Sequence, residues 1–271
     1  MVTPIDSPAV TPMTDGQRAD LRTYLLSSGI AGETNTPRDN CVANAIKLAD
    51  GDPDKSLGLG PRGRDAESVM QAVADLCGCS PSLDEREGGG VIDPDLVIDA
   101  LVAVEDRLVL AAEREERVLM ATGHPTGLLA LYQAIGRALT GGGARLQTPL
   151  HGVRLEPPRT LRRKRSVLYP DGVGVLAAGA DLVHTHESWP MEALLAEIEP
   201  PDLVLADHGW AGAAIARGIE TACFTDVNDP AIAVAKADGL VRLVVPCDDN
   251  LPPVHYEPVR DFLVGRIRVR T

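Results

Sequence analysis

The strongest constraint on the fold is an alternation of short apolar runs with helical stretches in the second half of the chain. A short apolar run is typical of a strand buried on both faces, and its alternation with helices indicates a parallel sheet. The runs and stretches lie at 118–121, 128–139, 145–147, 203–206, 211–217, 222–224, 230–237 and 241–245. We therefore predict an α/β fold with a mostly parallel, Rossmann-like sheet and helices on both faces.

The first half predicts helices instead. Asp93 caps the clearest one and Pro94 occupies its first position, where a missing N–H group costs nothing. Three more helices are expected over 16–30, 39–49 and 65–76, and the glycines at 88–90 are expected to form a flexible loop. At 271 residues the chain is near the upper limit for one core. The predicted organisation is a disordered tail (1–15), a mainly helical segment packing on the core (16–117), an α/β core (118–264) and a tail (265–271).

Composition excludes several classes of partner. A formal charge of −13 argues against a nucleic-acid partner held through its phosphates, and an aromatic content of 3% argues against base stacking. No apolar run is long enough to cross a bilayer, and residues 1–14 lack the pattern of a signal peptide. Five scattered cysteines fit reduced thiols in a cytoplasmic protein. The sequence is compatible with a homo-oligomer.

One basic run opposes the acidic balance of the chain. It comprises Arg159, Arg162, Arg163, Lys164 and Arg165. We expect an exposed loop beside the functional edge of the sheet, with a binding arm as the alternative to a merely solvated loop.

Polar side chains follow five of the predicted strands. In open α/β sheets the ligand crevice lies beyond the carboxyl ends of the strands, so these residues are predicted to share one edge. Four of the six histidines are among them. The polar segments are 122–127, 184–187, 207–210, 225–229 and 247–250.

The loop after the first strand is the predicted phosphate cradle. A glycine-flanked turn that leads into a helix presents backbone N–H groups and the positive end of the helix dipole. The expected phosphate-binding residues are Gly123, His124, Thr126 and Gly127. The loop lacks the ending of a nucleotide P-loop and the glycine fingerprint of dinucleotide binders. His124 could instead only cap the following helix.

A group of oxygen ligands is the predicted metal site. Carboxylates brought together repel one another unless a divalent cation neutralises them, and oxygen ligands suit magnesium or manganese. The expected ligands are Asp207, Asp226, Asn228 and Asp229. An ordinary helix cap before Pro230 also explains Asp229. His184, His186 and Asp248 are possible additional site residues, with a polar loop or a strand end as the alternative.

Covalent catalysis finds no support in the motifs. The chain lacks a Gly-x-Ser-x-Gly elbow and a cysteine phosphatase loop, and we find no Asp-x-Asp opening of an aspartyl-phosphate phosphatase. A metal-activated water is therefore the most economical nucleophile for phosphate hydrolysis.

Several strings resemble a family of actinobacterial proteins described as phosphatases. They are Ala121–Leu129, Pro201–Gly212, Asn228–Ala231 and Thr36–Asn40, and the resemblance spans roughly 18–264. It implies a phosphatase without implying a mechanism. The matching motif positions are His124, Asp207, His208, Asn228 and Asp229. The basic stretch 158–165 differs from the family's usual acidic or neutral loop, which leaves the substrate preference open.

The leading hypothesis is a metal-assisted phosphoric monoester hydrolase that acts on a small phosphorylated metabolite, without nucleic-acid or membrane partners. The proposed catalytic residues are His124, Asp207 and His208, with His124 or His208 protonating the leaving oxygen. The alternative is a non-hydrolytic protein that binds a phosphorylated ligand, or an isomerase or lyase of such a ligand. Convergence of the carboxylates on the loop would favour the first.

Overall fold

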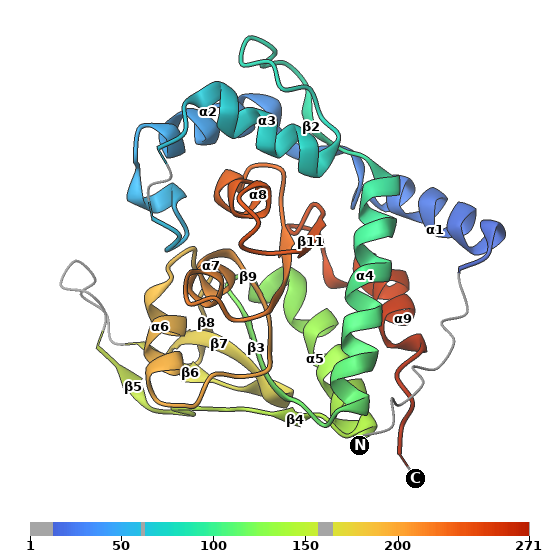
Figure 1. Cartoon of the computed structure of the whole chain (residues 1–271), viewed down its shortest axis with the longest axis vertical. Coiled ribbons are helices and arrows are strands. Elements are labelled where there is room, and N and C mark those ends of the chain that lie inside the picture. The colour runs from blue at the N-terminus through green and yellow to red at the C-terminus, as the bar shows by residue number, and fades with distance from the viewer. Residues whose placement is uncertain (1–12, 61–62, 157–164, 271) are drawn as a thin grey trace, which may run out of the picture.

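The described residues form one large sheet and one small one (Figure 1). The computed structural model describes residues 13–60, 63–156 and 165–270, so most of the predicted N-terminal tail and of the basic run lies outside the described residues. The large sheet has the order β11-β10-β9-β3-β7-β6-β5, with β4 beside β3 and β8 beside β7. Its strands are β3 (Arg117–Thr122), β4 (Arg145–Leu146), β5 (Arg154–Leu155), β6 (Arg165–Leu168), β7 (Val173–Ala178), β8 (Asp181–Leu182), β9 (Leu203–Asp207), β10 (Thr221–Thr225) and β11 (Leu243–Pro246).

The central strands are parallel, as the apolar runs predicted. β3 pairs in parallel with β4, β7 and β9, and the β9-β10 and β10-β11 pairs are parallel too. Every residue of β9, β10 and β11 is buried, which explains why their sequences carry no polar face. β5, β6 and β8 pair antiparallel, so the stricter expectation of a Rossmann-like sheet stays a prediction.

The chain changes direction across the sheet at β3. After β3 it builds β4 to β8 on one side and then returns to form β9, β10 and β11 on the other. The loops that leave β3 and β9 therefore diverge, although the two strands are neighbours. Such a switch point leaves a crevice beyond the carboxyl ends of the strands, where α/β proteins bind ligands.

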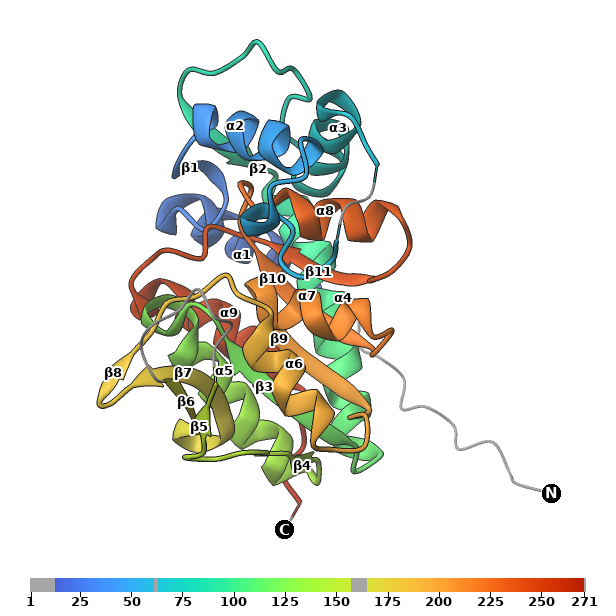
Figure 2. The same cartoon turned by 90° about the vertical axis from the view of Figure 1, so that its left-hand side faces the viewer.

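Helices cover both faces of the sheet (Figure 2). One face carries α4 (Pro94–Glu113), α5 (Pro125–Gly142) and α9 (Glu257–Gly265), and the other carries α6 (Trp189–Ala196), α7 (His208–Ala216) and α8 (Pro230–Ala237). Short 3-10 helices lie at Pro53–Lys55, Pro170–Gly172 and Pro253–Tyr256. Among the described residues, none of the helices has the length and apolar character that a membrane crossing requires.

The first third of the chain is helical but not only helical. The four expected helices are present as α1 (Asp15–Ser28), α2 (Arg38–Ala49), α3 (Ala66–Cys77) and α4. Between them β1 (Gly32–Pro37) and β2 (Gly89–Ile92) pair antiparallel, a small sheet that the sequence prediction missed. The prediction of a flexible loop at 88–90 is wrong from Gly89 on, because Gly89 is the first residue of β2. A Cβ atom at Gly89 would lie 2.3 Å from the Thr34 carbonyl. This glycine allows close strand pairing.

The predicted tail after residue 264 packs onto the core. Gly265 ends α9, Ile267 is buried, and the Arg266 guanidinium pairs with Glu105 at 3.0 Å.

Candidate metal centre

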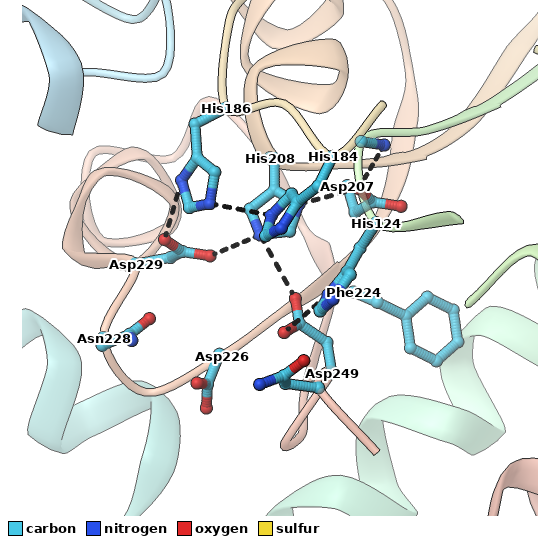
Figure 3. Close-up of polar contacts among 12 residues, drawn as sticks. His124, His184, His186, Asp207, His208, Phe224, Asp226, Asn228, Asp229 and Asp249 are labelled. Carbon is cyan, nitrogen blue, oxygen red and sulfur yellow. Dashed lines mark hydrogen bonds and ion pairs between the residues drawn. The ribbon is translucent and has the colours of Figure 1, made fainter. Parts of the chain in front are cut away.

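Four histidine side chains converge beyond the carboxyl ends of the parallel strands (Figure 3). His124 follows β3, His208 follows β9, and His184 and His186 lie in the segment between β8 and α6. The rings of His124 and His184 stack at 4.4 Å between centroids, and those of His186 and His208 lie 4.2 Å apart. The sequence predicted that strand ends would bring these four histidines together, and the structure does so.

Two carboxylates complete the cluster. The Nε2 atom of His208 lies 3.4 Å from Asp229 Oδ2 and 3.4 Å from Asp249 Oδ2. Asp249 Oδ1 lies 3.3 Å from His124 Nδ1. Asp229 was an expected ligand, whereas at the end of β11 the sequence favoured the neighbouring Asp248. Asp248 and Asp249 are the same residue type, so the sequence does not show which of them faces the histidines. The path of the backbone after β11 determines this.

Two overlapping sets of side chains have ligand atoms within 4.8 Å of one another. His208 belongs to both sets, with His124 and His184 in one and His186 and Asp229 in the other. The buried Oδ2 atom of Asp249 has no hydrogen-bond partner among the described residues. A buried anionic oxygen is costly unless a positive charge compensates it, and a cation at this point would do so.

Asp207 orients His208 from behind. Its Oδ1 atom accepts from the Gly123 N–H at 2.7 Å and from His208 Nδ1 at 2.9 Å. Because a carboxylate only accepts, Nδ1 carries the proton and Nε2 is directed toward the other carboxylates. We expected Asp207 to bind the metal, but its Oδ1 atom contacts Gly123 and the Nδ1 atom of His208, which is the place of a residue that orients a ligand.

The junction between β9 and α7 is strained. His208 is buried and has φ +47°, a left-handed conformation that is rare outside glycine. The next residue, Gly209, has no room for a side chain, since a Cβ atom would lie 2.2 Å from the His186 carbonyl. This close contact holds the segment of His184 and His186 against the start of α7.

The charges of the cluster depend on one another. Burial alone would lower the pKa of His208, but three surrounding carboxylates, Asp229 first, raise it to about 10. Burial lowers the pKa of His186 to about 3, and the charge of His208 adds to this effect. Burial raises the pKa of Asp229 to about 6, although His208 opposes the shift. Without a cation, a protonated His208 therefore compensates the carboxylates.

The expected phosphate loop is occupied by the protein itself. The N–H groups of Gly123, His124 and Gly127 donate to Asp207 Oδ1, Thr122 Oγ1 and the His124 carbonyl, respectively. Both glycines allow close packing, because Cβ atoms there would lie 2.3 Å from the carbonyls of Thr185 and Asp249. His124 is the N-cap residue of α5, and its carbonyl accepts from the Leu128 N–H, but its side chain makes no cap hydrogen bond and is directed to Asp249 instead. The loop positions His124, and Thr126 is the second residue of α5.

Three other expected residues make hydrogen bonds with other parts of the chain. Both oxygens of Asp226 are engaged, one by the Thr36 hydroxyl at 2.6 Å and the other by the Val227 N–H at 2.7 Å. Asp248 accepts from the N–H groups of Asn35 and Asn250. Asn228 contributes its backbone carbonyl to the Asn44 amide. These contacts tie the segments around the site to one another and to β1 and α2.

Comparison with known proteins connects this geometry to a reaction. The sequence model of a family described as Phosphatase matches residues 16–271. The chain belongs to this phosphatase family. Phosphatase SCO2771 of Streptomyces coelicolor is 38% identical over 255 residues, which cover 91% of this chain and 95% of that protein. The resemblance noted in the sequence is thereby confirmed, and membership of the phosphatase family indicates a hydrolase of phosphate esters.

Proposed function

We propose that this phosphatase uses a divalent metal ion to hydrolyse a small phosphorylated metabolite. The observation that carries the proposal is the gathering of three imidazoles and two carboxylates around His208 at the switch point of the sheet. Buried side chains of this kind gather where a cation compensates them, and phosphate hydrolysis is a reaction that such a cation can assist.

The donor atoms favour a first-row transition metal. Magnesium or manganese was expected from a site of oxygen ligands alone. Imidazole nitrogens suit zinc and iron, and the carboxylates of the same cluster suit manganese. Magnesium prefers a site of oxygen ligands alone and is therefore disfavoured. The ion would be held by His208 together with His186 and Asp229 or with His124 and His184, with Asp249 beside His208, and either set leaves coordination positions for water.

The chain's own groups prepare this site. Asp207 fixes the ring of His208, and the low pKa of His186 keeps that imidazole neutral and ready to bind a cation. A bound divalent ion would activate water and offset the charge of the phosphoryl oxygens. His208 cannot also protonate the leaving oxygen, because Asp207 holds its second nitrogen. His124 remains a candidate for that step only if it stays outside the coordination sphere.

Burial of the site supports a small substrate. His124 and His208 are each 3% exposed and Asp229 is 7% exposed, while the side chain of His186 is 39% exposed. A phosphoryl group can approach from the side of His184 and His186, but a broad macromolecular surface could not reach the buried ligands. Five free cysteines support a reducing compartment, and we propose the cytoplasm.

The test is hydrolysis of p-nitrophenyl phosphate and of a panel of phosphorylated metabolites, with metal content measured in parallel. We expect a chelator to abolish turnover and Mn²⁺ or Zn²⁺ to restore it. His184→Ala should lose metal and turnover, whereas His151→Ala, which removes a histidine outside the cluster, should keep both. Full turnover by protein shown to be metal-free would refute metal assistance, and ligand binding without turnover would favour the non-hydrolytic alternative.

A further inference from the structure

A short loop from the N-terminal half is tightly fixed against the metal centre's open side. Leu57 is buried with φ +49°, so its left-handed backbone is held by the surrounding packing. Its carbonyl rests against α7, where a Cβ atom at Gly212 would lie 1.8 Å away. A Cβ atom at Gly58 would lie 2.4 Å from the Ser188 side chain. The loop therefore contacts both α7, which begins with His208, and the residue just before α6.

These contacts place Lys55 near the exposed edge of the site. Ser188 is two residues after His186, and Lys55 is two residues before Leu57. The positive charge of Lys55 lowers the pKa of both His186 and Asp229, in agreement with the packing of its loop on this side of the cluster. The other side of the cluster is closed by the β3 and β11 loops.

The ammonium group of Lys55 is not engaged by another side chain in the described part of the chain. Among the residues with described positions, its side chain makes no ion pair and no hydrogen bond, and it is partly exposed. A lysine that served only stability would be expected to pair with one of the many carboxylates of this acidic chain. A fixed backbone that presents an unpaired ammonium beside a metal site is typical of anion recognition.

We propose that Lys55 binds the phosphoryl group of the substrate as it approaches the metal centre from the side of His186. This inference rests on the proposed phosphatase function. It supplies the cation that the loop 123–127 does not provide, since the N–H groups of Gly123, His124 and Gly127 are engaged within the protein. The phosphate is thus recognised from a segment that precedes the α/β core in sequence, and Leu57 is the anchor of that segment.

The test compares Lys55→Gln with Lys47→Gln in the full-length, metal-loaded protein. Lys47 is exposed at the end of α2, so the control removes the same charge away from the proposed contact. We expect Lys55→Gln to raise KM and the inhibition constant of inorganic phosphate roughly 10-fold or more, since hydrogen bonds to charged groups are strong. Lys55→Arg should restore part of the binding. Metal content and Tm should match those of the unmodified protein in all three variants.

Two measurements separate the failure of this inference from the failure of the proposed function. If the unmodified protein is active and Lys55→Gln leaves KM and phosphate inhibition unchanged, Lys55 does not bind phosphate. If the unmodified protein has no turnover, calorimetric binding of inorganic phosphate still compares the variants. Binding weakened only by Lys55→Gln would keep the inference and overturn hydrolysis, whereas equal or absent binding would overturn the inference.

Discussion

Replacing Asp207 by Asn tests how the metal centre is positioned. The amide oxygen can still accept from the Gly123 N–H and from His208 Nδ1, so the shape of the contact is retained. The substitution removes the negative charge that fixes the His208 tautomer and makes its Nε2 atom a stronger electron-pair donor to the metal. Loss of such an outer partner typically costs about 10- to 100-fold in metal affinity, or roughly 1.4–2.8 kcal/mol.

Two opposing effects decide the stability of the metal-free variant. Asp207 is fully buried beside other carboxylates, so its neutralisation relieves repulsion and desolvation. It also converts two charge-assisted hydrogen bonds into neutral ones, each weaker by about 1 kcal/mol. We expect the fold to be retained, with a Tm within a few degrees of that of the unmodified protein and turnover strongly reduced.

The assay is calorimetric titration of the metal-free protein with Mn²⁺, with thermal melting of the same samples. Asp202→Asn is the matched control, because Asp202 is an exposed aspartate just before β9 whose carboxylate pairs with Arg117. It should leave metal affinity unchanged. Normal metal affinity in Asp207→Asn would refute the orienting role, and a large fall in its metal-free Tm would show that Asp207 is a structural residue instead.

Three further predictions follow from the same contacts. Gly123→Ala should lower stability by about 1–3 kcal/mol and weaken metal binding, because the added Cβ atom would displace Thr185, which lies between two of the histidines. The control Gly265→Ala has open space around its Cβ position and should change neither property, so equal melting temperatures of the two variants would contradict this prediction. Metal binding at pH 8 should release about one proton, because the metal-free His208 has a pKa of about 10, and the metal affinity should therefore rise with pH. Calorimetry in buffers of different ionisation enthalpy measures the number of protons released, and a value of zero would argue against His208 as a ligand. Asp226→Asn should keep the metal affinity of the unmodified protein, as both carboxylate oxygens serve Thr36 and Val227, and a lost affinity would restore Asp226 as a ligand.

The position of the site could be predicted from the sequence because parallel strands have a simple geometry. Apolar runs identify the buried strands, and the carboxyl ends of parallel strands meet at one edge, so His124 and His208 had to lie near each other. The roles within the site could not be predicted in this way. Whether Asp248 or Asp249 faces the histidines, and whether Asp207 binds or orients, depends on the exact backbone path after each strand.

The missed elements have a similar physical origin. β1 has the sequence Gly-Glu-Thr-Asn-Thr-Pro, without the apolar alternation that announces a strand, and it is held by pairing with a distant glycine-rich segment. The contribution of Lys55 was equally hidden. Its loop reaches the site only through packing of Leu57 and Gly58 onto α6 and α7, which local sequence does not encode.

The adjacency of β3 and β9 also has a consequence for how the protein folds. The contact between Gly123 and Asp207, which are the neighbours of the proposed ligands His124 and His208, joins residues 84 positions apart. The other proposed ligands come from loops that follow other strands. Closing such long loops is slow, so the complete ligand set forms only after both halves of the sheet have docked. Early, partly folded chains therefore present few assembled ligands to a metal ion. Metal binding should slow unfolding and leave the folding rate nearly unchanged.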